Sequence, residues 1–375
     1  MLKSVHVIGL NGAHNFKASF HNDLNILTGK NGAGKTTLLK LMWYMMSSNR
    51  ELILPEIKFQ FAQIVTDKYT FTIDNRGGKK SGISTAYMEY IEGSGYSKKR
   101  NIIHDNGTII DDGREFIDEL NRRADLCQEE TIFFPTFRRI EGGFSTEQRL
   151  SRRLYGHFMS RLSEAVEEYS DAMSSSNHRF VASISTADIE DFLTRKYAYI
   201  SEKINAMYLE FSQFIRMRLS AENQTNQNGD EESAQKFRED IRRRLEEVNK
   251  NRESLMRPFD ILTKLIIKVF KDKGINIAQN LTLGQTKSAI GARILSAGEK
   301  QMFGFLSYNA FAKNCVIFID EPELSLHVDW QRILFKMVLK QSSSNQFVIT
   351  THSPFIYAAY PEKEWPLDVD RGGMV

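Results

Sequence analysis

The chain has 375 residues, 41% of them hydrophobic and 26% charged, which is typical of globular proteins and excludes a disordered, collagenous or purely coiled-coil chain. Its 50 Lys and Arg against 47 Asp and Glu give a net charge of +3, which neither demands nor excludes a nucleic-acid partner. Cys127 and Cys315 lie far apart in unrelated contexts and cannot build a disulfide framework or a zinc site. The N-terminus lacks a leader pattern and no apolar run reaches about 18 residues, so we expect a cytoplasmic protein with no membrane span.

The first part of the chain is expected to consist mainly of strands. β-Branched and aromatic residues are enriched in segments separated by turn residues, and one helix is expected after the second segment. The predicted strands span residues 4–9, 24–28, 58–66, 69–74 and 86–91, and the predicted helix spans 35–46. This pattern predicts a β-rich N-terminal lobe.

From Thr146 onward the sequence predicts helix for more than 110 residues, with breaks at Ser174 to Ser176 and at Glu222 to Glu232. Two amphipathic stretches with the same apolar spacing flank the polar segment from Glu222 to Glu232, which predicts an antiparallel helical hairpin. Its first arm is expected from Asp188 to Leu219, about 45 Å at 1.5 Å per residue. After Arg257 an apolar helix is expected, then strands between residues 281 and 293.

The C-terminal part alternates between expected helices and strands, over residues 297–312, 316–319, 328–339 and 347–350. Such alternation is typical of a parallel sheet. Together these segments predict an N-terminal lobe over 1–145, a helical insert over 146–257 and a C-terminal lobe over 258–375.

The run from Gly29 to Thr36 has the spacing of a phosphate-binding loop, with an apolar strand before it and a helix after it. Its glycines let backbone N–H groups converge on phosphate oxygens, while Lys35 reaches the β and γ phosphates and the Thr36 hydroxyl binds magnesium. A glycine-rich turn without a ligand is the alternative, which the flanking strand and helix disfavour. The candidate nucleotide-binding residues here are Gly29, Asn31, Gly32, Ala33, Gly34, Lys35, Thr36 and Thr37.

A second candidate site follows the apolar strand that ends at Asp320 and Glu321. Ligands of parallel sheets bind at the carboxyl ends of the strands, so we expect Asp320 to hold magnesium and Glu321 to polarise an attacking water. A strand ending in two carboxylates is also compatible with a capped turn. The phosphate-binding loop upstream favours the nucleotide interpretation.

Two further segments belong to the same pattern. Leu295 to Glu299 opens a helix about twenty residues before the acidic strand, and His352 follows the next strand. A lone histidine at a strand end is more often structural than catalytic. Here its position after two successive core strands favours a place over the γ-phosphate.

In this order the motifs resemble those of ATP-binding-cassette ATPases. Among these ATPases, they are most similar to the soluble SMC/RecF-like branch, which includes the OLD-type and anti-phage defence ATPases. The resemblance is to the AAA_15 and AAA_21 type, as in Septu- and PARIS-type systems. Gly29 to Thr36 resembles Walker A, Leu295 to Glu299 the signature, and Ile317 to Glu321 Walker B. Ser325 to His327 stands at the D-loop and His352 at the switch histidine. The run from Asp320 to His327, followed by Asp329-Trp330-Gln331, is more similar to the OLD branch than to transporters.

The sequence departs from this family pattern in three places. Glu299 stands where transporters usually have glutamine, and His327 replaces the usual acid of the D-loop. A glutamine is expected after the strand Thr131 to Phe134, yet the segment from Pro135 to Glu141 has none, and Arg138 or Glu141 is a candidate replacement.

The resemblance implies an α/β fold: an ABC-ATPase head of the P-loop NTPase class, with a mixed sheet, an antiparallel β subdomain and an inserted helical hairpin. It implies Mg²⁺-dependent ATP hydrolysis in a head-to-tail homodimer or higher homo-oligomer. Ser296, Gly298 and Glu299 of one chain would contact the nucleotide held by the other. The implied catalytic residues are Glu321, His352 and Lys35, and the implied metal ligands are Thr36 and Asp320.

Three functions remain open. The first is a sensor or regulatory scaffold of a bacterial anti-phage defence system that controls a separate nuclease effector; we expect no nuclease domain in the stretch that follows His352. The second is a repair or recombination ATPase that clamps DNA, although the Arg242 to Arg244 triplet lies among acidic residues, which is typical of a solvated helix face. The third is the nucleotide-binding subunit of a transporter, which the long insert disfavours.

Overall fold

The computed structural model describes residues 1–76, 83–90, 97–105, 108–109, 112–126, 129–136, 139–140, 164–225, 231–269, 295–341 and 343–368. The chain divides into two compact units. The first comprises Met1–Ser185, Leu295–Phe305 and Ala312–Val375, and the second comprises Thr186–Ile294 and Leu306–Phe311. The expected domain boundary at residue 146 lies outside the described residues, as do the strands expected between 281 and 293.

One sheet of the first unit is antiparallel. Its described strands follow the order β2-β1-β4-β5-β6-β7-β8. They are β1 (Leu2–Leu10), β2 (His14–Ser19), β4 (Phe61–Thr66), β5 (Tyr69–Asp74), β6 (Ile83–Tyr90), β7 (Ser97–Asp105) and β8 (Thr108–Ile109). In β1, the buried Val5 and Val7 alternate with the partly exposed His6, because successive side chains of a strand point to opposite faces.

The second sheet carries the motifs. Its described strands follow the order β11-β9-β13-β14-β3-β15, and all pairs are parallel. They are β3 (Leu24–Thr28), β9 (Glu130–Phe134), β11 (His178–Phe180), β13 (Cys315–Asp320), β14 (Gln346–Thr350) and β15 (Glu364–Pro366). Every residue of β3, β13 and β14 is buried, which explains why these strands are mostly apolar and do not alternate between apolar and polar residues. The predicted α/β class, with a parallel sheet and a separate antiparallel sheet, is confirmed.

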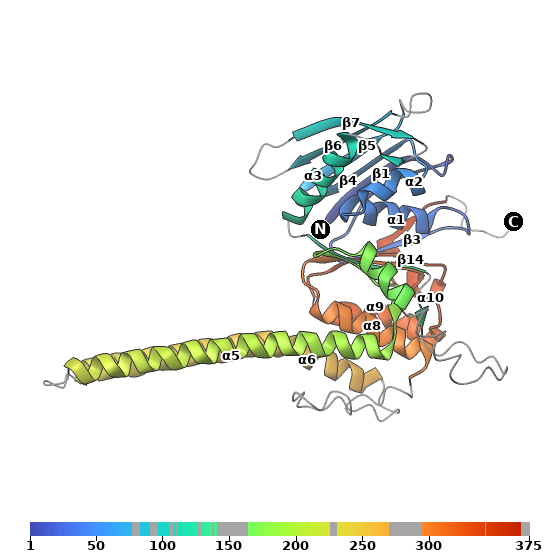
Figure 1. Cartoon of the computed structure of the whole chain (residues 1–375). Coiled ribbons are helices and arrows are strands. Elements are labelled where there is room, and N and C mark those ends of the chain that lie inside the picture. The colour runs from blue at the N-terminus through green and yellow to red at the C-terminus, as the bar shows by residue number, and fades with distance from the viewer. Residues whose placement is uncertain are drawn as a thin grey trace. The chain divides into compact units, whose positions relative to one another are not determined.

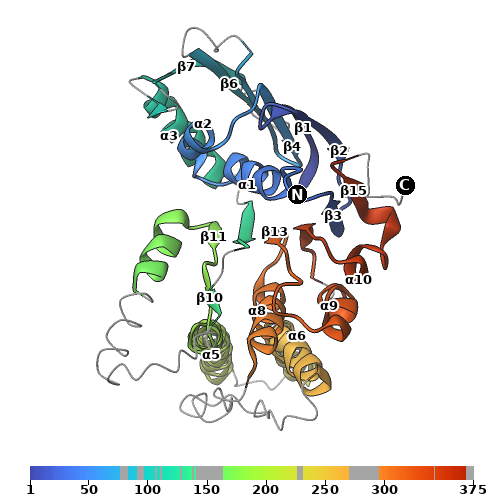
Figure 2. The ribbon, with the colours of Figure 1, turned by 90° about the vertical axis from the view of Figure 1, so that its right-hand side faces the viewer.

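Helices cover both faces of the parallel sheet. Helix α1 (Lys35–Met46) lies on the face toward the antiparallel sheet, and α9 (Val328–Lys340) lies on the opposite face (Figures 1 and 2). Because α1 is enclosed between two sheets, nearly all its side chains are buried, and Trp43 stacks on Phe133 with ring centroids 5.1 Å apart. The main hydrophobic core therefore surrounds the helix that begins at the phosphate-binding loop.

The other described elements include two helices of 15 residues, α3 and α8, and several short segments. They are η1 (Arg50–Leu52), α2 (Ile53–Glu56), α3 (Asp112–Leu126), β10 (Arg139–Ile140), β12 (Ser183–Ile184), α8 (Ala297–Phe311), α10 (Pro354–Tyr357) and η4 (Pro361–Lys363). Residues 164–173 are also helical.

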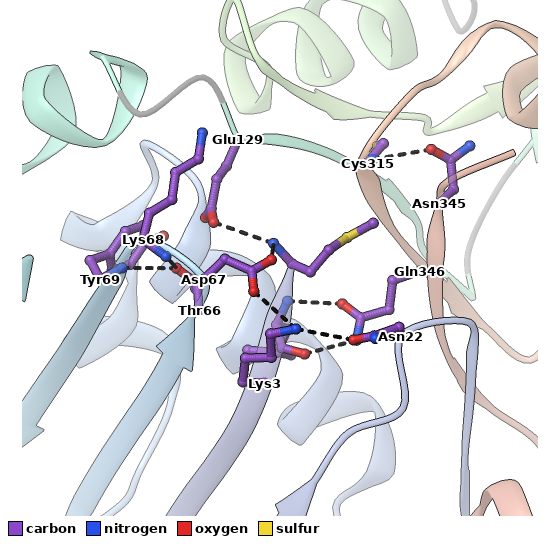
Figure 3. A network of polar contacts seen from close by, with 12 residues as sticks. Lys3, Asn22, Thr66, Asp67, Lys68, Tyr69, Glu129, Cys315, Asn345 and Gln346 are labelled. Atoms are coloured by element: carbon purple, nitrogen blue, oxygen red, sulfur yellow. Dashed lines mark hydrogen bonds and ion pairs between the residues drawn. The ribbon is translucent and has the colours of Figure 1, made fainter. Parts of the chain in front are cut away.

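Polar side chains join the two sheets where β1 passes the start of β14 (Figure 3). The fully buried Gln346 accepts a hydrogen bond from the Leu2 N–H at 2.8 Å and donates to the carbonyl oxygens of Leu2 at 2.8 Å and His21 at 2.7 Å. Next to it, the Asn345 side chain accepts from the Cys315 N–H at 3.1 Å. These amides satisfy backbone groups that burial would otherwise leave without partners.

The second unit contains the helical hairpin that the apolar spacing predicts. Helix α5 (Thr186–Thr225) and helix α6 (Glu231–Val269) lie side by side, and α5 spans 40 residues, about 60 Å. The first arm is thus longer than the stretch from Asp188 to Leu219. The Arg244 guanidinium lies 4.1 Å from the centre of the Phe214 ring, a contact between the two arms.

The described helix over residues 164–173 ends at the break expected at Ser174 to Ser176, but the strands that follow this break were not expected. Strand β11 pairs with β9, and the two residues of β12 pair with β10 before α5 begins. Strands of two or three residues are too short to show a period-2 pattern, so the sequence does not reveal them.

Candidate functional site

The loop from Gly29 to Gly34 connects β3 to α1 at the carboxyl end of the parallel sheet. Gly34 caps α1 with φ at 86°, a left-handed conformation that glycine adopts without steric cost. The buried Lys35 ammonium donates to the carbonyl oxygens of Gly29 and Lys30, both at 3.0 Å. Burial lowers the pKa of Lys35, while the negative charges of Glu321 and Asp320 act in the opposite direction.

The Asp320 carboxylate, at the end of β13, accepts hydrogen bonds from hydroxyl groups of three neighbouring segments. The Thr36 hydroxyl of α1 donates to its carboxylate at 3.1 Å, and the Thr350 hydroxyl at the end of β14 also donates to it. A third donor is Thr136, which follows β9. The expected candidates at that position, Arg138 and Glu141, lie outside the described residues. Sequence reasoning missed Thr136, although its place after a core strand was a usable signal.

The donors around Asp320 suit a hard divalent cation. Magnesium prefers oxygen ligands and is typically held by one or two carboxylates together with substrate phosphates. The Thr36 hydroxyl and the Asp320 carboxylate already lie within hydrogen-bond distance of each other. This donor set therefore fits a magnesium ion bound together with a nucleotide. Among the described residues there is no group of three or more His, Cys, Asp or Glu that could hold a metal ion.

Glu321 and His352 face each other across the ends of β13 and β14. The His352 Nε2 lies 3.9 Å from a carboxylate oxygen of Glu321. The backbone of Glu321 is left-handed, with φ at 48°, and its N–H donates to the carbonyl and hydroxyl oxygens of Thr350 at 3.2 and 3.1 Å. Burial raises the pKa of the Glu321 carboxyl, and the charges of Asp320 and Glu323 add to this, whereas His352 and Lys35 oppose it.

These segments enclose a cleft of about 240 Å³. It is lined by Asn11, Asn31, Gly32, Gly34, Lys35, Thr36, Thr37, Glu321 and His352. The structure thus brings the phosphate-binding loop together with the acidic strand and the switch histidine. Asn11, at the turn between β1 and β2, was not expected from the sequence; its side-chain amide lies 3.5 Å from the Thr37 hydroxyl.

Ser296, Gly298 and Glu299 are not among the residues that line this cleft. They form the start of α8, where the Ser296 N–H donates to the Glu299 carboxylate at 2.7 Å. A Cβ atom on Gly298 would lie 2.3 Å from the Ser325 carbonyl oxygen, so only glycine allows α8 to approach this loop. The expected signature therefore packs against the segment that follows Glu321.

His327, the expected D-loop residue that replaces the usual acid, caps α9. Its ring accepts a hydrogen bond from the Asp329 N–H at 3.4 Å, and its side chain is 76% exposed. A solvent-exposed capping role accounts for this histidine.

None of the helices within the described ranges is both long enough and apolar enough to cross a membrane.

Comparisons with known proteins match the chain to one family model. The family model AAA_15, described as an AAA ATPase domain, matches residues 1–357. Among solved structures, the chain is similar to the Smc head domain with an extended coiled coil bound to the C-terminal domain of ScpA from Pyrococcus furiosus, at 15% identity and a TM-score of 0.36. It is also similar to an SmcHead bound to the C-winged helix domain of ScpA, at 11% identity and a TM-score of 0.41. Each comparison covers 95% of this chain and 91% of the other. No curated protein matches the chain.

Proposed function

The chain belongs to the AAA_15 family of AAA ATPase domains, and on that premise we propose that it binds and hydrolyses Mg²⁺–ATP across a head-to-tail dimer. The observation that carries this proposal is the convergence of Lys35, Thr36, Asp320, Glu321 and His352 at one edge of the parallel sheet. These residues come from three separate segments of the sequence. Each supplies a group that phosphoryl transfer to water requires.

The phosphates bind at the N-terminus of α1, where backbone N–H groups and the helix dipole favour negative charge. Lys35 is held beside this position by two carbonyl oxygens, and a phosphate oxygen offers its ammonium a stronger, charge-assisted partner. Thr36 and Asp320 would hold the magnesium ion. When bound, the ion neutralises the charge that develops on the phosphate oxygens.

Glu321 orients the attacking water and accepts its proton, and His352 lies beside this carboxylate. The raised pKa of Glu321 makes its carboxylate a stronger base than an exposed glutamate. The left-handed backbone at Glu321 directs its side chain into the cleft that His352 also lines. Both groups are therefore positioned before substrate binds.

The proposed dimer is supported by the separation of two sets of residues. Ser296 and Gly298 lie at the start of α8 and outside the cleft of their own chain. A helix N-terminus is suited to bind a phosphate, and a second copy can present its nucleotide there. Ser296 and the Gly298 backbone are then the contacts to the γ-phosphate of the partner's ATP. The side chain of Glu299 caps its own helix, so we assign it a structural role in this contact.

As biological context, we propose a sensor or scaffold of an anti-phage defence system that controls a separate nuclease effector. The resemblance of the run from Asp320 to Gln331 to OLD-type and defence ATPases supports this role. The alternative, a DNA clamp, depends on the hairpin arginines. Arg242 pairs with Glu246 at 3.0 Å, Arg243 pairs with Asp240 at 2.8 Å, and Arg244 lies over Phe214. Because all three have partners within the hairpin, this triplet does not favour the clamp.

The biochemical proposal is tested by ATP binding and turnover of the purified chain. We expect Lys35→Ala to abolish both, while Lys336→Ala, which removes an exposed lysine of α9, leaves both unchanged. A Lys35→Ala variant that binds and hydrolyses ATP normally would contradict the assignment of the site. The defence role is tested by plaque counts on bacteria that carry the gene with its neighbours, where protection should require Lys35.

A further inference from the structure

Two loops at the edge of the cleft are connected by side-chain hydrogen bonds. The first loop, residues 321–327, follows β13, and the second, residues 351–353, follows β14 and contains His352. The Glu323 carboxylate of the first loop accepts a hydrogen bond from the His352 N–H at 2.6 Å. The position of the switch histidine backbone is thus set by an acidic side chain of the neighbouring loop.

Gln331 of α9 makes a second connection between the same loops. Its amide nitrogen donates to the Leu326 carbonyl oxygen at 2.9 Å, and its amide oxygen accepts from the Ser353 hydroxyl at 2.6 Å. A single side chain therefore bonds to the first loop with one end and to the second loop with the other. Both ends are used, so substitution of Gln331 breaks a bond to each loop.

The two carboxylate oxygens of Glu323 differ in their hydrogen bonds. One carboxylate oxygen bonds to His352, while the other is buried and has no hydrogen-bond partner among the described residues. A buried polar atom without a partner costs about 1–3 kcal/mol. Glu323 therefore makes its hydrogen bond to the His352 N–H at a cost in stability.

The loop 321–327 also contacts the start of α8. The buried Gln301 side chain of α8 donates to the Pro322 carbonyl oxygen at 2.9 Å. The Ser325 carbonyl oxygen lies directly against Gly298, as described above. A displacement of α8 must therefore displace the loop that positions His352, because close-packed backbone groups cannot move independently.

We propose that Glu323 and Gln331 are positioning residues that hold His352 opposite Glu321 and link this geometry to the position of α8. The proposal rests on the ATPase function proposed above and deepens it. Neither residue lines the cleft, so both act through the segment from Thr351 to Ser353. In the proposed dimer, the start of α8 contacts the nucleotide of the partner chain. Because α8 also contacts the loop that positions His352, the placement of His352 opposite Glu321 in one site depends on whether the other site holds a nucleotide.

The test compares Glu323→Ala, Glu323→Gln, His352→Ala and the double variant Glu323→Ala/His352→Ala. The measurements are kcat for ATP hydrolysis, the Kd of a fluorescent ATP analogue and the midpoint of thermal unfolding. We expect Glu323→Ala to lower kcat by about 10- to 100-fold, the usual effect of a misplaced catalytic group, with unchanged Kd. Glu323→Gln should restore most of the rate, because its amide oxygen accepts from the His352 N–H. Glu362→Ala, which removes an exposed glutamate elsewhere, is the matched control.

The double variant separates positioning from an independent role. If Glu323 acts through His352, the double variant has the same kcat as His352→Ala, since the group that Glu323 positions is already gone. A double variant whose loss equals the product of the two single losses would overturn the proposal. So would a Glu323→Ala variant with wild-type kcat.

The variant Gln331→Leu provides a second, independent test of the positioning proposal. It retains a similar volume and loses both hydrogen bonds, and Ser353→Ala loses only one of them. We expect both to lower kcat and Gln331→Leu to lower it more. A wild-type chain that neither binds nor hydrolyses ATP would instead overturn the proposed function itself. If the wild type hydrolyses ATP and Lys35→Ala does not, the proposed function holds, and wild-type kcat in the Glu323 and Gln331 variants would then overturn the positioning proposal alone.

Discussion

Ser296 and Glu299 cap helix α8 reciprocally. The Ser296 N–H donates to the Glu299 carboxylate at 2.7 Å, and the Glu299 N–H donates to the Ser296 hydroxyl at 3.4 Å. This is a capping box, in which two N–H groups that the first turn leaves without helical partners are both satisfied. It explains why glutamate is acceptable where transporters usually have glutamine, since either side chain can accept the Ser296 N–H.

The cap predicts how substitutions at these positions change stability. We expect Ser296→Ala and Glu299→Ala each to lower the free energy of unfolding by about 1 kcal/mol. Glu299→Gln retains an acceptor and should remain close to the wild type. Urea denaturation of the four proteins measures the difference. Equal losses for Glu299→Ala and Glu299→Gln would show that charge, and not the cap, determines the effect.

Replacement of Gly298 by a larger residue should cause a steric clash at the contact between α8 and the loop 321–327. In Gly298→Ala the new methyl group would lie 2.3 Å from the Ser325 carbonyl oxygen, a backbone atom. We expect a loss of about 1–3 kcal/mol in unfolding free energy, since the loop must shift. At Gly304 the nearest atom to a new methyl group is a side-chain carbon of Ile184 at 2.8 Å. Gly304→Ala is the comparison, and it should cost less because a side chain moves more easily. The reverse order of the two losses would contradict this account.

Glu321→Gln should separate binding from hydrolysis. Glutamine retains the shape of the side chain but cannot accept a proton from water, so we expect turnover to fall by about 100-fold or more while ATP still binds. The ATP-bound dimer should then accumulate, and light scattering after size-exclusion chromatography with and without ATP measures it. Normal turnover in this variant would show that another group is the base.

His178 predicts a pH dependence of stability. Its ring is buried, its Nδ1 lies 2.9 Å from the Thr131 hydroxyl, and burial together with the Arg50 charge lowers its pKa from 6.5 to about 3. Below pH 6.5 the unfolded chain binds a proton that the folded chain does not bind. This histidine therefore lowers the free energy of unfolding as pH falls from 6.5 toward 3, by at most about 1.4 kcal/mol per pH unit.

The measurement is urea denaturation between pH 7.5 and 5.5 for the wild type and for His178→Gln. The variant removes the titrating group and retains a side chain that can bond to Thr131. Its stability should decline less steeply over this range than that of the wild type. Parallel declines would show that other groups cause the pH dependence.

The nucleotide site was predictable because its residues lie in recognisable local patterns. Lys35 and Thr36 belong to a contiguous loop, Asp320 ends a fully buried strand, and His352 follows another fully buried strand. The carboxyl ends of parallel strands meet at one edge, so the alternation of helices and strands was enough to bring these segments together.

Contacts made by single polar side chains were not predictable. Asn11 stands alone in the sequence, and only the turn after β1 brings it to the site. The bonds of Glu323 and Gln331 likewise depend on the spacing of two loops that are about thirty residues apart. No periodic pattern records such contacts, because they depend on tertiary geometry and not on local conformation.

Strand β3, which leads into the phosphate-binding loop, has both neighbours in the sheet near the end of the chain. It pairs with β14 on one side and β15 on the other, and the Leu367 N–H donates to the Thr28 carbonyl oxygen at 2.9 Å. During synthesis the ribosome therefore releases β3 long before either partner exists. The antiparallel sheet can form early from neighbouring hairpins, whereas the ATP site can assemble only after β14 and β15 have been translated. A nascent chain that stalls before β14 would thus display a phosphate-binding loop on an unpaired strand and would need protection from aggregation.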